Sequence, residues 1–271
     1  MNHLSPLQPL RGLAARLALS LALLCTASCQ GFQQQVRNLN LYTPAEDSQL
    51  GAAAFQDVIA TEPLLSSGPA VDQVERVTER LVASAREMRP GIAEGFGWEV
   101  VVIDRPDVVN AFCLPGGKMA VYTGILAVAG SDAGLAVVMG HEIAHATERH
   151  GTERLTRNGL IGGALEVLLE NEDERAVGEL LANLGVGLPW GREDELEADL
   201  VGLRILANAG YDPREAARFW ERMSLATGGG GSSGLEEFLS THPSNSTRIQ
   251  ALEAAVPGVL PLYEASLGRQ P

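Results

Sequence analysis

The sequence predicts an α+β fold that is mostly helical, with a small antiparallel sheet beside the helices. Apolar residues recur at helical spacing in several stretches, which is the pattern of helices that bury one face. Two short runs rich in β-branched residues are separated by a segment that ends in Pro-Gly-Gly, which indicates a tight turn. Of the 271 residues, 45% are hydrophobic and 20% are charged, as in ordinary folded chains.

The elements follow from these patterns in chain order. Helices are expected over residues 47–59, 70–88, 133–150, 155–184 and 192–208, then after Pro213 and after Asn245. The runs 98–103 and 118–123 predict two strands, and the tight turn between them indicates that they form the small sheet.

The apolar segment from Gly124 to Gly140 raises the question of a membrane span. Its seventeen residues are interrupted by Ser131-Asp132 and fall short of the roughly 20 that a spanning helix needs. Two buried helices explain the pattern better, the second one capped by Asp132 and ending near Gly151.

Charge and cysteine content exclude several classes of protein. The chain has 20 Lys and Arg against 34 Asp and Glu, which gives a formal net charge of −14. This balance argues against a nucleic-acid-binding surface and against a polybasic membrane patch, because both need an excess of cations. Three cysteines are too few for a disulfide-rich scaffold.

Residues 1–28 are predicted to be a lipoprotein-type signal peptide. Two cations precede the apolar run 17–24, which is too short for an anchor helix. The segment Thr26-Ala-Ser-Cys29 resembles a bacterial lipobox, in which Cys29 would carry the lipid; a plain cleaved signal is the alternative. Gln30 favours the outer over the inner membrane. We therefore expect a lipid-anchored protein of the bacterial cell envelope that faces the periplasm.

The rest of the chain divides into three expected parts. Residues 29–46 are polar and aperiodic, as in a tether, and residues 257–271 form a C-terminal tail. The domain between them spans residues 47–256.

A metal-binding sequence lies in the helix expected over residues 133–150. In His141-Glu-Ile-Ala-His145 the two histidines are four residues apart, so both imidazoles lie on one helical face and reach one ion. Glu142 next to the first histidine can take a proton from a metal-bound water. A helix that carries these residues by chance is the alternative.

A catalytic zinc centre needs a third protein ligand, and positions 150 and 151 are the first candidates for it. In metzincins a third histidine follows six residues after the second, but Gly151 holds that position here, so this class is excluded. His150 is one residue out of register and is expected to point away from the His141 and His145 face. It is interpreted as a surface or helix-end residue.

The acidic segment 192–199 offers the third ligand instead. Glu195 and Asp199 share one helical face, so we assign Glu195 as the ligand and Asp199 as the group that orients a ligand imidazole. Gly202 would allow a close helix approach. The remaining acids are interpreted as a solvated face at a helix start; they are Glu193, Asp194 and Glu197.

The chain resembles the HtpX-like, CAAX-prenyl-protease-type zinc metallopeptidases (gluzincins, metallopeptidase family forty-eight), and most closely their soluble periplasmic lipoprotein branch. The likeness covers about residues 47–252. It depends on an ordered set of sequence elements: Asn110-Ala-Phe, Pro115-Gly-Gly117, Thr123-Gly124, His141-Glu-Ile-Ala-His145, Glu195 with Asp199, Ala209-Gly-Tyr-Asp-Pro213, Thr241-His-Pro243 and Arg248-Ile249.

The resemblance implies a zincin-like metalloprotease domain with one Zn²⁺ per chain on His141, His145 and Glu195. It places His242 near the metal, either on the open coordination site or as an oxyanion stabiliser, and Arg248 as a positive group nearby. A substrate peptide would lie extended against an edge strand. This strand is expected to contain Gly117, Lys118, Met119, Ala120 and Val121.

The expected function is zinc-dependent hydrolysis of peptide bonds in misfolded envelope proteins, with Glu142 as the general base. One alternative is a latent or chaperone-like lipoprotein that binds zinc and unfolded polypeptide but cleaves little. A purely structural zinc site is the third possibility, and Glu142 argues against it because such a site needs no base. Cys113 stands where a small apolar residue is expected, and its role stays open.

Overall fold

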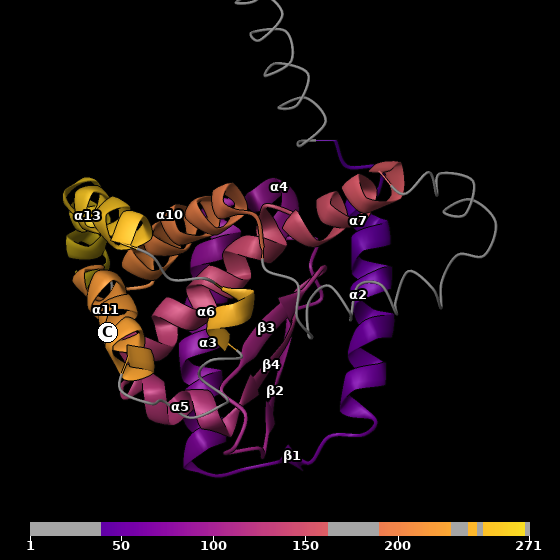
Figure 1. The fold of residues 1–271 in the computed structure, drawn as a ribbon, viewed down its shortest axis with the longest axis horizontal. Coiled ribbons are helices and arrows are strands. Elements are labelled where there is room, and N and C mark those ends of the chain that lie inside the picture. The colour runs from indigo at the N-terminus through magenta and orange to yellow at the C-terminus, as the bar shows by residue number, and fades with distance from the viewer. Residues whose placement is uncertain (1–38, 162–189, 229–237, 243–245, 269–271) are drawn as a thin grey trace, which may run out of the picture. The chain divides into compact units, whose positions relative to one another are not determined.

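The computed structural model describes residues 39–161, 190–228, 238–242 and 246–268 (Figure 1). The chain divides after Asn40 into two units, and every element described below belongs to the second unit. Residues 1–28, Cys29 and most of the expected tether lie outside the described residues.

The sheet has four strands in the order β1-β2-β4-β3. β1 pairs antiparallel with β2, β2 pairs parallel with β4, and β4 pairs antiparallel with β3. Their bounds are Leu64–Leu65 for β1, Glu99–Ile103 for β2, Ala111–Leu114 for β3 and Lys118–Tyr122 for β4.

The sheet is therefore mixed, and the two predicted strands, β2 and β4, run parallel instead of antiparallel. The Pro-Gly-Gly turn does join an antiparallel pair, but its first strand is β3, which the sequence did not predict. All four residues of β3 are buried, so the alternation of polar and apolar residues that marks a half-buried strand is missing. Gly116 and Gly117 make the turn with φ of +79° and +86°.

Two helical layers enclose the sheet, with α2 (Pro44–Ile59) on one face and α3 (Pro69–Met88) and α6 (Asp132–Thr147) on the other (Figure 1). Successive side chains of β3 and β4 point to opposite faces of the sheet, so alternate residues pack into different cores. Cys113 and Met119 join the larger core with α3 and α6, whereas Phe112 and Ala120 join the smaller core against α2.

Of the expected helices, α2, α3 and α10 begin and end within three residues of the predicted bounds, whereas the helix expected over residues 155–184 begins at His150, and its expected course beyond Ile161 lies outside the described residues. α2 is capped by Thr43, which forms a capping box with Glu46, so this helix starts within the expected tether. α13 continues without a break past residue 257, where the tail was expected. The helices are α2 (Pro44–Ile59), α3 (Pro69–Met88), α4 (Pro90–Ala93), α5 (Thr123–Ala129), α6 (Asp132–Thr147), α7 (His150–Ile161), α10 (Arg192–Asn208), α11 (Arg214–Gly228) and α13 (Ser246–Leu267).

The helix that holds the two histidines differs from the prediction at both ends. Its cap is Ser131, whose hydroxyl accepts from the Gly134 N–H, while Asp132 binds Arg76 on α3. The helix ends at Thr147 rather than near Gly151. Arg149 adopts a positive φ of 64°, which turns the chain sharply before α7 begins.

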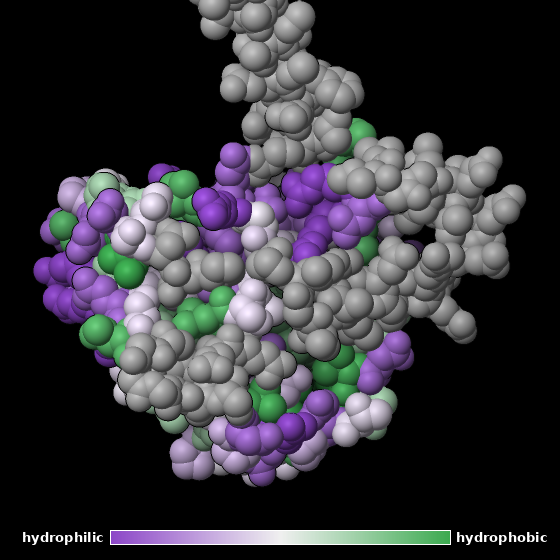
Figure 2. Space-filling model, in the orientation of Figure 1, coloured by the Kyte–Doolittle hydropathy of each residue, from purple (hydrophilic) through white to green (hydrophobic). Residues whose placement is uncertain are grey.

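Within the described residues, no helix combines the length and the apolar content that crossing a membrane requires. On the face drawn in Figure 2, hydrophobic residues form separate patches among hydrophilic ones wherever the surface is coloured.

Candidate metal centre

The site is built where α6 and α10 touch through two glycines. A Cβ on Gly202 would lie 2.9 Å from the Gly140 backbone, so the two helices can approach this closely only because both positions lack side chains. The predicted role of Gly202 in helix approach is confirmed. His141 follows Gly140 directly, and Glu195 and Asp199 precede Gly202 on α10, so the contact brings these side chains together.

Four buried side chains converge, and their ligand-type atoms all lie within 4.8 Å of one another; they are His141, His145, Glu195 and His242. The Nε2 atoms of His141 and His145 are 3.0 Å apart. Glu195 Oε1 lies 3.3 Å from His145 Nε2, and Glu195 Oε2 lies 3.5 Å from His141 Nε2. Ligands at zinc bond lengths in a tetrahedron are about 3.3 Å apart, so this geometry fits a metal ion.

The charge of the cluster also fits a cation. Three carboxylates, those of Glu142, Glu195 and Asp199, are buried here against one buried guanidinium, that of Arg248. An excess of buried negative charge is costly unless a positive group compensates it. Burial opposes charging of His141, yet Glu195 and Asp199 raise its pKa to about 10, which reflects the same excess. Two imidazoles and a carboxylate are the ligands typical of a catalytic zinc site.

Asp199 contacts His141 on the side away from the cluster, and Arg248 in turn binds Asp199. Asp199 Oδ1 lies 3.0 Å from His141 Nδ1, the nitrogen that points away from the cluster. Arg248 donates to both oxygens of Asp199 at 2.6 and 2.7 Å and reaches Glu195 Oε2 at 2.6 Å. Burial alone would raise the pKa of Asp199, but the bonds from Arg248 and His141 lower it overall, so the carboxylate stays charged.

His150 lies beside this site and is buried, so its interpretation as a surface residue is wrong, although it does stand at a helix end, as the first residue of α7. The turn at Arg149 folds α7 back, so His150 is buried with its Nδ1 2.9 Å from Nδ1 of His145. Helical spacing from His141 does not give the direction of His150, because α6 ends at Thr147 and His150 belongs to the next helix. The composition did contain a signal for His150. The chain has five histidines, and all of them except His3 lie at this site.

The acidic residues at the start of α10 differ in exposure. The side chain of Glu197 is exposed, as expected, and lies 3.6 Å from His150 Nε2. Asp194 was expected to be solvated as well, but it is buried and accepts a hydrogen bond from Arg157 of α7 at 3.0 Å. The pairing with α7 could not be read from the sequence of α10 alone.

Glu142 lies between the histidine cluster and the sheet. The backbone N–H of Cys113 on β3 lies near its carboxylate and favours the charged form, and its Oε1 atom is 3.5 Å from Nε2 of His242. Oε1 is buried and has no hydrogen-bond partner within the described residues. Burial raises the pKa of Glu142, although His242 and His141 oppose this shift. Burial also raises the pKa of the Cys113 thiol well above its usual range, so this thiol stays protonated.

The strand predicted to be the sheet edge is an inner strand. β4, which contains Lys118 to Val121, pairs with β2 on one side and β3 on the other, so its backbone is occupied. The terminal strand beside Glu142 is β3. The prediction failed because β3 went unrecognised, which left β4 with an apparently open edge.

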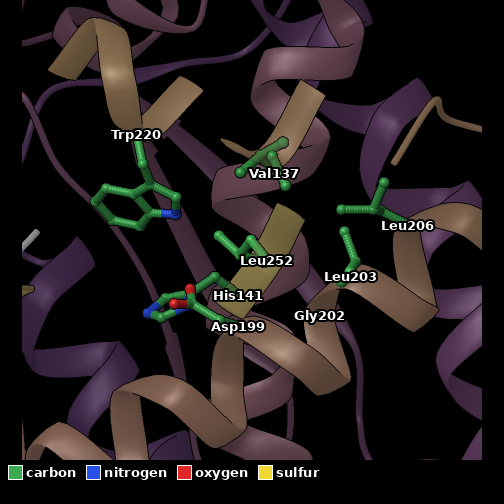
Figure 3. A pocket seen from close by; sticks show the side chains of 9 residues that line it. Val137, His141, Asp199, Gly202, Leu203, Leu206, Trp220 and Leu252 are labelled. Carbon is green, nitrogen blue, oxygen red and sulfur yellow. The ribbon is translucent and has the colours of Figure 1, made fainter. Parts of the chain in front are cut away.

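Aromatic rings enclose the cluster. Trp190 stacks on His145 at 4.5 Å between ring centroids, and Trp220 meets the edge of His141 at 5.9 Å. Behind His141 and Asp199 lies a cavity of about 10 Å³, which has room for one water molecule at most (Figure 3). Its other lining residues are mostly apolar: Val137, Gly202, Leu203, Leu206, Ala216, Trp220 and Leu252. The rear of the cluster is therefore shielded from bulk water.

Comparison with known proteins agrees with this site. The sequence profile of peptidase family M48 matches residues 70–256, which include His141, His145, Glu195 and His242. The chain belongs to this family, whose members are zinc metallopeptidases, as the sequence resemblance implied.

Three relatives illustrate the likeness. A mitochondrial metalloendopeptidase OMA1 of Arabidopsis thaliana is 43% identical over 60% of this chain and 32% of the relative. The Schizosaccharomyces pombe protein of the same name is 34% identical over 78% of this chain and 61% of the relative. The beta-barrel assembly-enhancing protease of Escherichia coli is 25% identical over 75% and 42%, respectively. The chain thus matches about one third to three fifths of the length of these relatives.

The predicted location is contradicted by these relatives. The two with the higher identities are mitochondrial, whereas the bacterial one is matched at 25%. The expected location in a bacterial cell envelope, facing the periplasm, is therefore wrong, whereas the lipid anchor at Cys29 stays a prediction. It depended on the few residues around Cys29, which lie outside both the family match and the described residues.

Proposed function

We propose that this protein is a zinc-dependent endopeptidase whose ligands are His141, His145 and Glu195 and whose general base is Glu142. The observation that carries the proposal is the close approach of the three ligand side chains, whose nitrogen and oxygen atoms lie 3.0–3.5 Å apart, beside a buried carboxylate that has an oxygen without a hydrogen-bond partner in the described residues. A structural zinc site closes its coordination with protein ligands and needs no such carboxylate.

Each group of the site has a task in peptide hydrolysis. A zinc ion held by these three ligands supplies a Lewis acid that activates water and polarises a carbonyl. Glu142 takes a proton from the attacking water and later gives it to the leaving amine, and its raised pKa suits this exchange. Asp199 holds the His141 ring in the orientation that directs Nε2 into the cluster.

A polypeptide substrate would bind extended along the outer edge of β3. Tyr122 N–H donates to the Asn110 carbonyl, so in the antiparallel ladder the backbone groups of Phe112 also face β4. The backbone N–H and C=O groups of Ala111 and Cys113 then point to the opposite edge of β3. At that edge the Cys113 N–H lies near the Glu142 carboxylate. Main-chain pairing grips any sequence, so unfolded or misfolded segments are suitable substrates.

His242 supports a second candidate function, a latent or chaperone-like protein that binds zinc and unfolded polypeptide with little cleavage. Its Nδ1 atom is 3.1 Å from Glu195 Oε1 and 3.3 Å from His141 Nε2, within the spacing of metal ligands. A fourth protein ligand would leave no coordination position for water. In the active form, the same ring would stabilise the oxyanion instead.

The test compares the wild-type protein with Glu142→Gln and His242→Ala. Zinc per chain is measured on the purified proteins, and cleavage is measured with casein as an unfolded substrate. An endopeptidase binds one zinc in all three proteins and loses cleavage by about 10²-fold or more in Glu142→Gln, because the general base is gone.

Each other outcome has a definite meaning. Cleavage by Glu142→Gln at the wild-type rate contradicts the mechanism. One zinc without cleavage in wild type, together with cleavage in His242→Ala, favours the latent site. Wild-type protein that binds no zinc rules out both functions.

A further inference from the structure

His145 contacts a buried ring whose role is not explained by the ligand set alone. His150, the first residue of α7, is 2% exposed, and its Nδ1 lies 2.9 Å from Nδ1 of His145. On its other side, His150 Nε2 faces Glu197 Oε2 at 3.6 Å, which is longer than a hydrogen bond but close enough for a charge interaction.

The direction of the hydrogen bond between the two rings follows from the geometry. His145 directs Nε2 toward Glu195 and His141, so Nε2 must be the unprotonated nitrogen when it binds a metal. The proton of the neutral ring is then on Nδ1, and this N–H donates to Nδ1 of His150. His150 consequently carries its own proton on Nε2, toward Glu197, and the acidic side chain favours this tautomer.

We propose that His150 is a positioning residue for the metal centre: it accepts the Nδ1–H of His145 and fixes the tautomer and the ring orientation that direct Nε2 to the ion. The inference rests on the proposed metal site. His150 does for His145 what Asp199 does for His141, so each imidazole ligand has its own hydrogen-bond acceptor behind it.

The chain conformation around His150 is held in place by a second set of contacts. Arg149 has a positive φ of 64°, a backbone conformation that residues other than glycine rarely adopt. Its guanidinium donates to Asp47, which is 1% exposed, and to the carbonyl of Tyr42. These bonds, which Arg149 donates to α2 and to the chain just before it, compensate the strained turn, and the turn places His150 against His145.

The experiment measures metal affinity and needs no turnover. Zinc affinity of the full chain is determined by competition with a chromogenic chelator, and the visible spectrum of the Co²⁺ form reports the ligand field. The variants are His150→Asn, His150→Gln and His150→Leu. Asn places its amide oxygen where Nδ1 stands, Gln places its amide one bond further out, and Leu has no acceptor.

We expect His150→Leu and His150→Gln to bind zinc about 10–100-fold more weakly and to shift the Co²⁺ bands. His150→Asn should keep near wild-type affinity and spectrum. If His150→Leu fails to fold, as shown by circular dichroism, the contrast between Asn and Gln still decides. Glu153→Gln is the matched control, because it removes a charge that acts on His150, and within the described residues Glu153 forms no hydrogen bond with either ring.

Two results would overturn the inference: wild-type affinity in both His150→Gln and His150→Leu, or a loss in His150→Asn as large as that in His150→Gln. Failure of the proposed function is distinguishable, because then wild type and His141→Ala would bind zinc equally poorly. Two ions in wild type and one in His150→Leu would also contradict it, because His150 would itself be the ligand of a second ion.

Discussion

Arg248 binds the two buried carboxylates of Asp199 and Glu195 at 2.6–2.7 Å. Its guanidinium also lies over the ring of Trp220. Burial opposes its charge, but Asp199 and Glu195 raise the pKa of Arg248 above its usual value. The guanidinium therefore compensates charge that the protein interior would otherwise have to neutralise.

Replacing Arg248 with Met should lower the free energy of unfolding of the metal-free protein by about 3–5 kcal/mol, because two buried carboxylates lose their counter-charge. Urea titration followed by circular dichroism measures this change. Arg214→Met is the control, since Arg214 pairs with Asp212 at the surface, where solvent screens the pair and its loss should change the stability little. A similar small loss in both variants would refute the prediction.

At the level of single residues, spacing was a good guide wherever one helix carried both partners. His141 with His145, and Glu195 with Asp199, were paired because residues four apart share a face, and the structure brings these pairs together. His150 was missed because its direction depends on the turn at Arg149, which Asp47 of a distant helix stabilises.

At the level of elements, the contact of α6 with α10 sets the distance between the two halves of the metal site. His141 and His145 lie on α6, and Glu195 lies on α10. A Cβ on Gly202 would lie 2.9 Å from the Gly140 backbone, whereas a Cβ on Gly140 would lie 3.3 Å from the Gly202 carbonyl oxygen.

Gly202→Ala should therefore destabilise the protein by about 1–3 kcal/mol relative to Gly140→Ala, through overpacking between the helices. Both changes gain the same helix propensity, about 1 kcal/mol, so their difference isolates the clash. Thermal unfolding gives the stabilities, and zinc affinity should fall in Gly202→Ala as α10 moves away. Equal stability and equal zinc affinity of the two variants would contradict this prediction, because the contact would then tolerate a side chain at residue 202.

The sheet is the element that the sequence predicted least well. The sequence predicted two strands, β2 and β4. It did not predict β3, the strand that borders Glu142. β3 is short and buried along its whole length, so its sequence, Ala-Phe-Cys-Leu, carries no alternation. Its pairing with β4, and the parallel pairing of β4 with β2, depend on contacts between segments that are distant in the chain.

For the molecule as a whole, the proposed metal ion would join α6 and α10, and it would lie close to His242, which precedes α13 in the chain. These segments are separated by up to about a hundred residues of chain, since His141 and His242 lie 101 positions apart. An ion that binds only when they are assembled stabilises the folded state against the unfolded one.

Removal of the ion with a chelator should therefore lower the Tm. At free zinc about 1,000-fold above the Kd the stabilisation is about 4 kcal/mol, which corresponds to about 8–16 °C for a chain of this size. Scanning fluorimetry with and without chelator measures the shift. His141→Ala should show no response to zinc or chelator, and a zinc-dependent Tm in that variant would place the ion elsewhere.

The sequence by itself determined the family, the mostly helical α+β class and the residues that meet at the proposed metal site, because these depend on local periodicity and on side-chain chemistry. It did not determine the location, for which the few residues around Cys29 were a poor guide.

Only the tertiary structure decided the strand order, the edge that borders Glu142 and the place of His150. Each of these depends on packing between segments far apart in the chain: β3 against β4, α10 against α6, and α2 against the turn at Arg149. Such contacts form only when the hydrophobic core assembles, and no local pattern records which distant segment will supply the partner.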